Sequence, residues 1–293
     1  MRQLGSLLNG VGRTGEARSQ FAAAIQFARD LGDRRLECSA IHGLGNLEHS
    51  EGRGDEALVC YEHALTLARG FGDRNVQGML LGNLANAHET LGRIDQARTS
   101  NEETLVFARE TGNRRLEGNT LCNLGLHYLL QGRLDEAHAA FQAVLVLARE
   151  LGAVLLECVV RCNLGIVLER LALSDEALAQ FEAAVRIAHV LNEPRYEGQF
   201  LGYLGLLHAR QGRHEDAQHC LDAGEAMLRS VSDRLGLGVH LTSIAEARQL
   251  AGNSAAARAS LAAATTLAAE VGAGPTSEIG LALTRVRALL ESV

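Results

Sequence analysis

The chain has 293 residues, of which 47% are hydrophobic and only 4% aromatic, with no Trp and two Pro. This composition favours helices packed through alanine and leucine over a sheet-based core. The formal charge is −7, and all 28 basic residues are arginine. Binding to nucleic acid needs concentrated positive charge, which a mildly acidic chain without basic clusters does not offer. We therefore expect no nucleic-acid partner.

The start of the chain gives no targeting signal. Met1 is not followed by an apolar core of the signal-peptide type, and no apolar run approaches the roughly 20 residues that span a bilayer. We expect a cytoplasmic protein that does not contact a membrane.

A forty-residue repeat runs through the chain. A glycine recurs at this spacing, with only Ala172 interrupting the series, at Gly12, Gly52, Gly92, Gly132, Gly212 and Gly252. Five residues after each of these positions stands an alanine, from Ala17 to Ala257. Such a period is typical of a solenoid, in which each unit buries its apolar face only against its neighbours. We therefore predict one elongated, all-α domain over residues 1–293.

Each repeat is predicted to be a pair of helices, A and then B. In the second copy, apolar residues at three- and four-residue steps form two runs, Leu36 to Leu47 and Ala57 to Ala68. Gly52 marks the reversal between the two helices, since glycine adopts the left-handed conformation without a Cβ clash. Asp73 is placed to cap the next helix A.

The repeat register divides the chain into three parts. Residues 1–32 are a truncated first pair, residues 33–272 are six forty-residue repeats, and residues 273–293 are a C-terminal capping helix with Ile279, Leu283, Val286 and Leu290 on its apolar side. The truncated start leaves an exposed end, which makes a homo-oligomer formed through that end one interpretation.

The six cysteines share repeat positions with small residues. Cys38 and Cys158 stand where other copies carry glycine, and so do Cys122 and Cys162. Cys60 and Cys220 replace serine or alanine. No second pair accompanies Cys158 and Cys162 at zinc spacing, so we predict small-side-chain positions and no metal site.

The repeated residues resemble the tetratricopeptide repeat. The resemblance rests on Leu-Gly within helix A, glycine at the turn, alanine five residues later, and an aromatic at Tyr61, Phe141 or Phe181. The usual unit has about 34 residues. The stretch from Gly72-Asp73-Arg74 through Gly82 to His88 looks like the forty-residue variant of LGN/Pins adaptors and of the helical arms of bacterial signalling ATPases and regulators. It implies an α-solenoid that forms a right-handed superhelix with helix A on the concave face.

The resemblance also implies a peptide-binding groove along helix A. By matching positions, its lining comprises Asn46, Asn83, Asn86, Asn123, Leu126, Leu130, Asn163, Ile166, Arg170, Tyr203, Leu206 and Arg210. Asparagine amides donate to and accept from a peptide main chain, and the two arginines suit carboxylates.

A purely structural interpretation of these residues stays open. The asparagines Asn83, Asn123 and Asn163 would then bond to neighbouring helices. The apolar residues would belong to the core, and the arginines would be solvated surface charges.

No catalytic arrangement recurs in the sequence. The 11 histidines occupy unrelated repeat positions, and the glycines belong to turns and packing positions, not to a phosphate-binding loop. We therefore predict a protein that is not an enzyme and has no cofactor. The first hypothesis is a scaffold that binds a peptide segment of a partner protein in the groove. The alternative is a peptide- or ligand-sensing arm of a larger bacterial signalling ATPase or transcription regulator.

Overall fold

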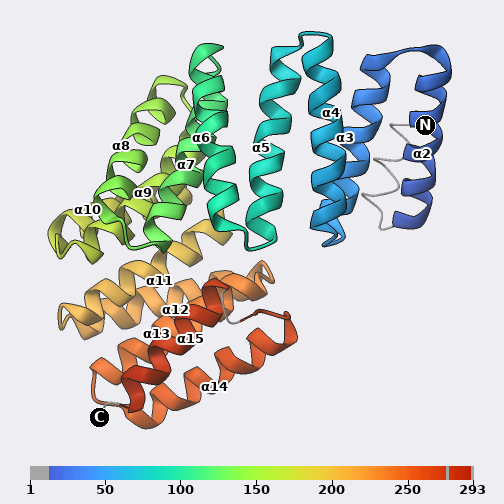
Figure 1. Cartoon of the computed structure of the whole chain (residues 1–293). Coiled ribbons are helices and arrows are strands. Elements are labelled where there is room, and N and C mark those ends of the chain that lie inside the picture. The colour runs from blue at the N-terminus through green and yellow to red at the C-terminus, as the bar shows by residue number, and fades with distance from the viewer. Residues whose placement is uncertain (1–12, 275–276, 292–293) are drawn as a thin grey trace. The chain divides into compact units, whose positions relative to one another are not determined.

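The computed structural model describes residues 13–274 and 277–291. These residues form helices joined by short turns and include no strand, which confirms the all-α prediction (Figure 1). The helices are α2 (Thr14–Leu31), α3 (Arg34–Ser50), α4 (Gly54–Gly70), α5 (Arg74–Thr90), α6 (Ile94–Glu110), α7 (Arg114–Leu130), α8 (Leu134–Glu150), α9 (Val154–Arg170), α10 (Ser174–Val190), α11 (Pro194–Arg210), α12 (His214–Ser230), α13 (Arg234–Leu250), α14 (Ser254–Glu270) and α15 (Glu278–Glu291).

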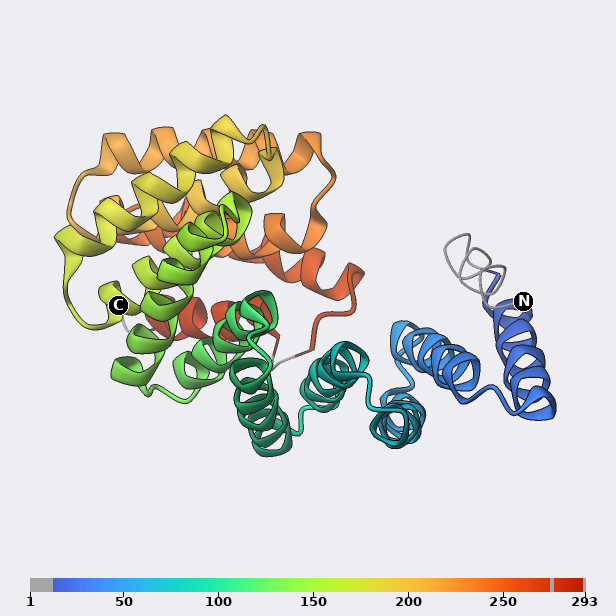
Figure 2. The same cartoon turned by 90° about the horizontal axis from the view of Figure 1, so that it is seen from above.

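Two compact units make up the chain, Met1–Arg133 and Leu134–Val293. The first contains α2 to α7 and the second α8 to α15. Within each unit consecutive helices pack as antiparallel pairs, such as α3 with α4 and α11 with α12, which confirms the predicted helix pairs. We call the odd-numbered helices α3 to α13 helix A and the even-numbered helices helix B. Figure 2 shows the helices of the first unit from a second direction, in chain order from α2 to α7.

Each turn between described helices contains one residue in the left-handed conformation, twenty residues from the next. Ten of these residues are glycines, for example Gly52 with φ 75° and Gly92 with φ 68°. The residue after the glycine closes the turn, as where the backbone N–H of Asp73 donates to the carbonyl of Ala68 at 3.2 Å. The helix ends are thus defined by the repeated glycine, as the sequence predicts.

Ala172 adopts the same left-handed conformation, with φ 62°. A Cβ there costs about 1–2 kcal/mol, partly offset by the greater freedom that glycine has in the unfolded chain. We expect Ala172→Gly to raise the free energy of unfolding by about 1 kcal/mol, measured by urea denaturation followed by circular dichroism. The control is Ala251→Gly, because Ala251 has φ −79° and gains nothing from glycine. A lower urea midpoint for Ala172→Gly would contradict this account.

Helix caps follow the repeat as well. The side chain of Asp73 accepts from the backbone N–H of Val76, and Asn113 accepts from Leu116 in the next copy. Asp33 and Asp233 cap α3 and α13 in the same way. The predicted cap at Asp73 is confirmed.

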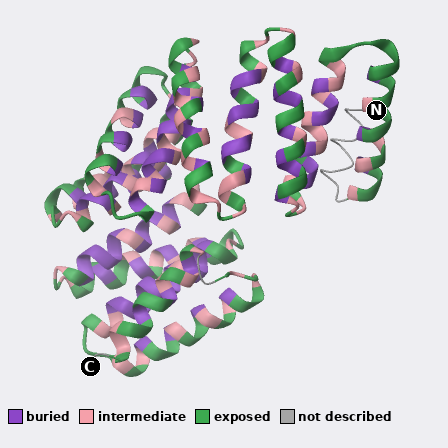
Figure 3. Ribbon diagram, in the orientation of Figure 1, coloured by how far each residue is buried: buried purple, intermediate pink, exposed green. Residues whose placement is uncertain are grey.

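The core is built from the repeated alanines and aromatics. An alanine stands five residues after each turn from helix A to helix B. It is buried in every copy, at Ala17, Ala57, Ala97, Ala137, Ala177, Ala217 and Ala257. The Leu-Gly glycines make room for the ring of the following helix B: a Cβ on Gly45 would lie 2.7 Å from the Tyr61 ring, and one on Gly165 would lie 2.6 Å from Phe181. Figure 3 shows the buried residues as stripes along the helices.

One copy replaces the core aromatic with a polar pair. Asn101 stands at the aromatic position and is 1% exposed. Its amide donates to Nε2 of the buried His127 of α7 at 3.3 Å. Burial of an amide is tolerated here because it has a partner.

The cysteines lie where the helices come close. The thiols of Cys38 and Cys158 donate to the carbonyls of Ala64 and Ala184 at 3.3 and 3.2 Å, so each fits against the backbone of helix B. All six cysteines are free thiols. In the part of the chain that the structure describes, no group of three or more His, Cys, Asp and Glu side chains is placed to hold a metal ion.

None of the described helices combines the length and the apolar character that a membrane span requires. The single domain over residues 1–293 and the right-handed superhelix stay predictions.

Candidate functional site

A polar network links successive helix A members of the first unit. The amide of Asn83 on α5 donates to Nε2 of His42 at 2.8 Å and to Oδ1 of Asn46 at 3.4 Å, both on α3. One helix further on, the amide of Asn123 on α7 donates to Oδ1 of Asn86 at 3.3 Å. The structural interpretation of Asn83 and Asn123 therefore holds in part, because both residues join neighbouring helices.

Asn46 and Asn86 use only half of their hydrogen-bonding capacity. Both are exposed, and both accept through Oδ1, Asn46 from the Tyr61 hydroxyl at 2.9 Å and Asn86 from Asn123. Their amide nitrogens donate to no described residue. A free amide therefore stands on the exposed side of α3 and again on α5, one repeat apart, where it can bind a backbone carbonyl.

The other predicted lining residues differ in exposure. Leu130, at the end of α7, is 62% exposed, whereas Leu206 of α11 is 4% exposed. Leu126, Asn163, Ile166 and Tyr203 are partly buried, and Arg170 and Arg210 are exposed. Leu206 therefore lies in the core, which is the alternative left open for the apolar residues.

Arg210 is bonded by two carboxylates of its own unit. Its guanidinium donates to Glu169 of α9 at 2.6 Å and to Glu246 of α13 at 2.5 Å. Burial opposes the charge, but Glu246 and Glu169 hold the pKa of Arg210 above its ordinary value. This arrangement joins three helix A members, and the donors of Arg210 are engaged within the chain.

The C-terminal helix α15 packs against α13 and α14. Ile279 lies against the bare backbone of α13, since a Cβ on Gly238 would meet its Cδ1, and Leu283 and Val286 are buried beside it. Arg285 of α15 pairs with Glu246 of α13 at 3.2 Å. The helix thus follows the last repeat with the predicted apolar side turned inward.

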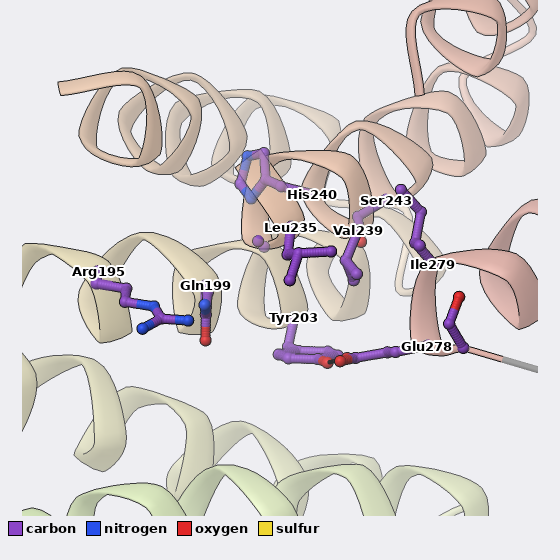
Figure 4. Close-up of a pocket in the computed structure, with 12 residues that line it drawn as sticks. Arg195, Gln199, Tyr203, Leu235, Val239, His240, Ser243, Glu278 and Ile279 are labelled. Atoms are coloured by element: carbon purple, nitrogen blue, oxygen red, sulfur yellow. Dashed lines mark hydrogen bonds between the residues drawn. The ribbon is translucent and has the colours of Figure 1, made fainter. Parts of the chain in front are cut away.

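A cavity of about 380 Å³ lies between α11, α13 and the first turn of α15 (Figure 4). It is lined by Arg195, Gln199, Gly202, Tyr203, Leu235, Gly236, Val239, His240, Ser243, Ser277, Glu278 and Ile279. Cavities of this size accommodate small molecules or single side chains.

Tyr203 is held in place on the cavity wall. Its ring stacks on Phe181, with centroids 6.0 Å apart, and its hydroxyl donates to Glu278 at 2.5 Å. Burial, with a contribution from the Glu278 carboxylate, raises the pKa of Tyr203 well above its ordinary value, so the hydroxyl stays protonated. Tyr203 therefore acts as a neutral donor to Glu278.

The buried His240 of α13 lines the cavity and packs against α11 and α12. Nε2 of His240 donates to the carbonyl of Leu221 at 2.8 Å, and burial lowers its pKa, so the ring is neutral near pH 7. The ring occupies the space beside Gly202 and Gly224, whose added Cβ atoms would lie 2.6 and 2.4 Å from it. These two glycines admit a large residue at a position that is alanine, Ala40, in the first complete copy.

Comparisons with known proteins agree with this architecture. Profiles of the tetratricopeptide repeat match residues 36–110, 76–150, 116–189 and 198–223, more than half of the chain. The chain belongs to the tetratricopeptide repeat family, and its fold is an α-solenoid of antiparallel helix pairs. No curated protein matches it significantly in sequence.

Several solved structures share this fold. The apo form of RapI has a TM-score of 0.77 at 13% identity, covering 92% of this chain and 97% of that one. A signal transduction ATPase with a tetratricopeptide repeat sensor from Pyrococcus horikoshii has a TM-score of 0.73 at 16% identity, covering 90% of this chain and 40% of that one. The Rap conjugation regulator of plasmid pLS20 in complex with the Phr* peptide has a TM-score of 0.61 at 16% identity, covering 90% and 77%.

The cavity residues other than Tyr203 are absent from the predicted lining. Gln199 lies one helical turn before Tyr203, so extending the predicted lining by one turn would find it. Ser243 occupies the position of Tyr203 one repeat later, and Val239 lies one turn before Ser243. Glu278 has no such signal, because its position depends on how α15 packs against the last repeats.

Proposed function

We propose that this protein is a non-catalytic scaffold that binds an extended peptide segment of a partner along the exposed side of helix A. The supporting observation is the free amide of Asn46 and of Asn86 on successive helices, each oriented by a hydrogen bond to its oxygen. Amides that present a donor beside a peptide fix its main chain without demanding a particular sequence. The Rap regulator solved with a peptide has the same fold and supports this use.

A second candidate is a sensing arm of a larger signalling protein. The ATPase from Pyrococcus horikoshii supports it, because that protein is described as having a tetratricopeptide repeat sensor and this chain covers 40% of its length. An open reading frame that continues upstream of Met1 into an ATPase would favour the arm.

A bulky substitution on the exposed side of helix A tests whether peptides bind there. Peptides are selected from a random display library on the wild-type protein, and their affinities are measured by fluorescence polarisation. We expect Asn86→Arg to weaken the selected peptides by at least about tenfold, roughly 1.4 kcal/mol, because it removes the amide and fills the site.

The matched control is Val106→Arg, at a position 58% exposed on helix B of the same repeat. It should leave the affinity unchanged within about twofold. Failure to select any peptide that binds better than its scrambled version, or an equal loss in the two variants, would overturn the scaffold.

A further inference from the structure

The cavity between α11, α13 and α15 contains one charge without a counter-ion. Arg195 is matched, since it and Gln199 both donate to Oδ2 of Asp233, at 3.2 and 2.7 Å. Glu278 accepts only from the neutral hydroxyl of Tyr203, and no arginine or histidine among the described residues lies within 4 Å of its carboxylate. Arg285, two turns along α15, pairs with Glu246 instead. The exposed Glu278 therefore borders the cavity without an ion-pair partner within 4 Å among the described residues.

The surroundings of Glu278 define the shape of a matching ligand. Its carboxylate lies at one end of the cavity and Arg195 at the other, with Tyr203 between them (Figure 4). The wall that faces this space is apolar: Leu235 is 54% exposed, and Val239 lies one turn further along α13. An aliphatic stem would cover this wall while its charged head reaches Glu278.

The carboxylate of Glu278 favours a guanidinium over an ammonium, because a guanidinium can donate two parallel N–H groups to a carboxylate. The Ser243 hydroxyl also lines the cavity. A guanidinium has five donors in a plane and bonds to several acceptors at once, whereas an ammonium is a compact point charge.

We infer that this cavity is a subsite for an arginine side chain of the bound peptide, with the guanidinium on Glu278 and the stem on Leu235 and Val239. The inference rests on the proposed function, because it assigns one residue of the peptide that the helix A side would bind.

The test uses the full-length protein labelled with 3-fluorotyrosine, which gives four ¹⁹F resonances, one for each tyrosine. Tyr203→Phe assigns the Tyr203 signal. The probes are N-acetylargininamide and its neutral isostere N-acetylcitrullinamide. We expect the arginine compound to shift the Tyr203 resonance saturably at roughly millimolar concentration, and the citrulline compound to bind at least about tenfold more weakly.

Glu278→Gln removes the charge but keeps an acceptor for Tyr203, so α15 retains its contact. It should weaken N-acetylargininamide at least about tenfold, while Glu291→Gln, an exposed glutamate at the end of the same helix, should not. Equal binding of the two probes, or an unchanged affinity in Glu278→Gln, would overturn the subsite.

The two proposals fail separately. Selected peptides that bind irrespective of arginine would exclude the subsite and leave the scaffold intact. A Glu278-dependent shift without any selected peptide would leave the cation site and exclude the scaffold.

Discussion

Replacing Gly202 with alanine is expected to lower the free energy of unfolding by about 1–3 kcal/mol, whereas the same change at Gly82 raises it by about 1 kcal/mol. Gly82 and Gly202 occupy the same position of helix A in two copies that are three forty-residue repeats apart. A Cβ at Gly202 would lie 2.6 Å from Nδ1 of His240, whose ring is fixed by its bond to Leu221. A Cβ at Gly82 meets only Leu116, at an ordinary 3.9 Å, so the better helix propensity of alanine prevails.

Urea midpoints of the two variants measure this difference on the intact chain. Hydrogen exchange by mass spectrometry then shows where stability is lost, which we expect within α11 to α13 for Gly202→Ala. A change of the same sign in both variants would mean that these glycines are not distinguished by their neighbours.

Removing Arg210 should also destabilise the second unit, by about 2–3 kcal/mol for Arg210→Ala. Breaking a buried pair costs about 3–5 kcal/mol, and we reduce this because the Arg210 side chain is 33% exposed. The loss leaves the Glu169 and Glu246 side chains, 17% and 8% exposed, without the guanidinium that joins them, while Arg285 still pairs with Glu246. The melting temperature and the urea midpoint should both fall.

The control is Arg229→Ala, which removes a surface pair with Glu225 on the same helix, where the arginine side chain is 59% exposed. Exposed pairs contribute about 0–1 kcal/mol, so we expect little change. If Arg210→Ala were as mild, Arg210 would be a surface charge available for ligands, as the sequence left open.

The architecture could be predicted because each structural device is local. A left-handed turn favours glycine, a cap favours Asp or Asn, and close packing on an aromatic favours a small residue, so Gly52, Asp73 and Gly45 each indicate their role. Repetition makes these predictions firmer, since the same type of residue recurs forty residues later. The structure adds that Ala172 keeps the left-handed conformation and that the buried Asn101 has a hydrogen-bond partner.

The candidate site was predicted in part, because its contacts are between repeats. Asn83 and Asn123 recur at one position of helix A, but their bonds to Asn46 and Asn86 depend on which residues of adjacent helices face each other. The ion pairs of Arg210 span 41 and 36 residues, close to one repeat, and such spacing is readable in retrospect. The cavity was missed because Glu278 reaches it only through the packing of α15.

The path of a bound peptide tests the central claim most directly. A selected peptide that carries a photoreactive benzoylphenylalanine is cross-linked to the wild-type protein, and the modified residues are identified by mass spectrometry. We predict cross-links on the exposed side of helix A around Asn46 and Asn86. Cross-links confined to the exposed side of helix B, around Val59 and Val106, would contradict the account.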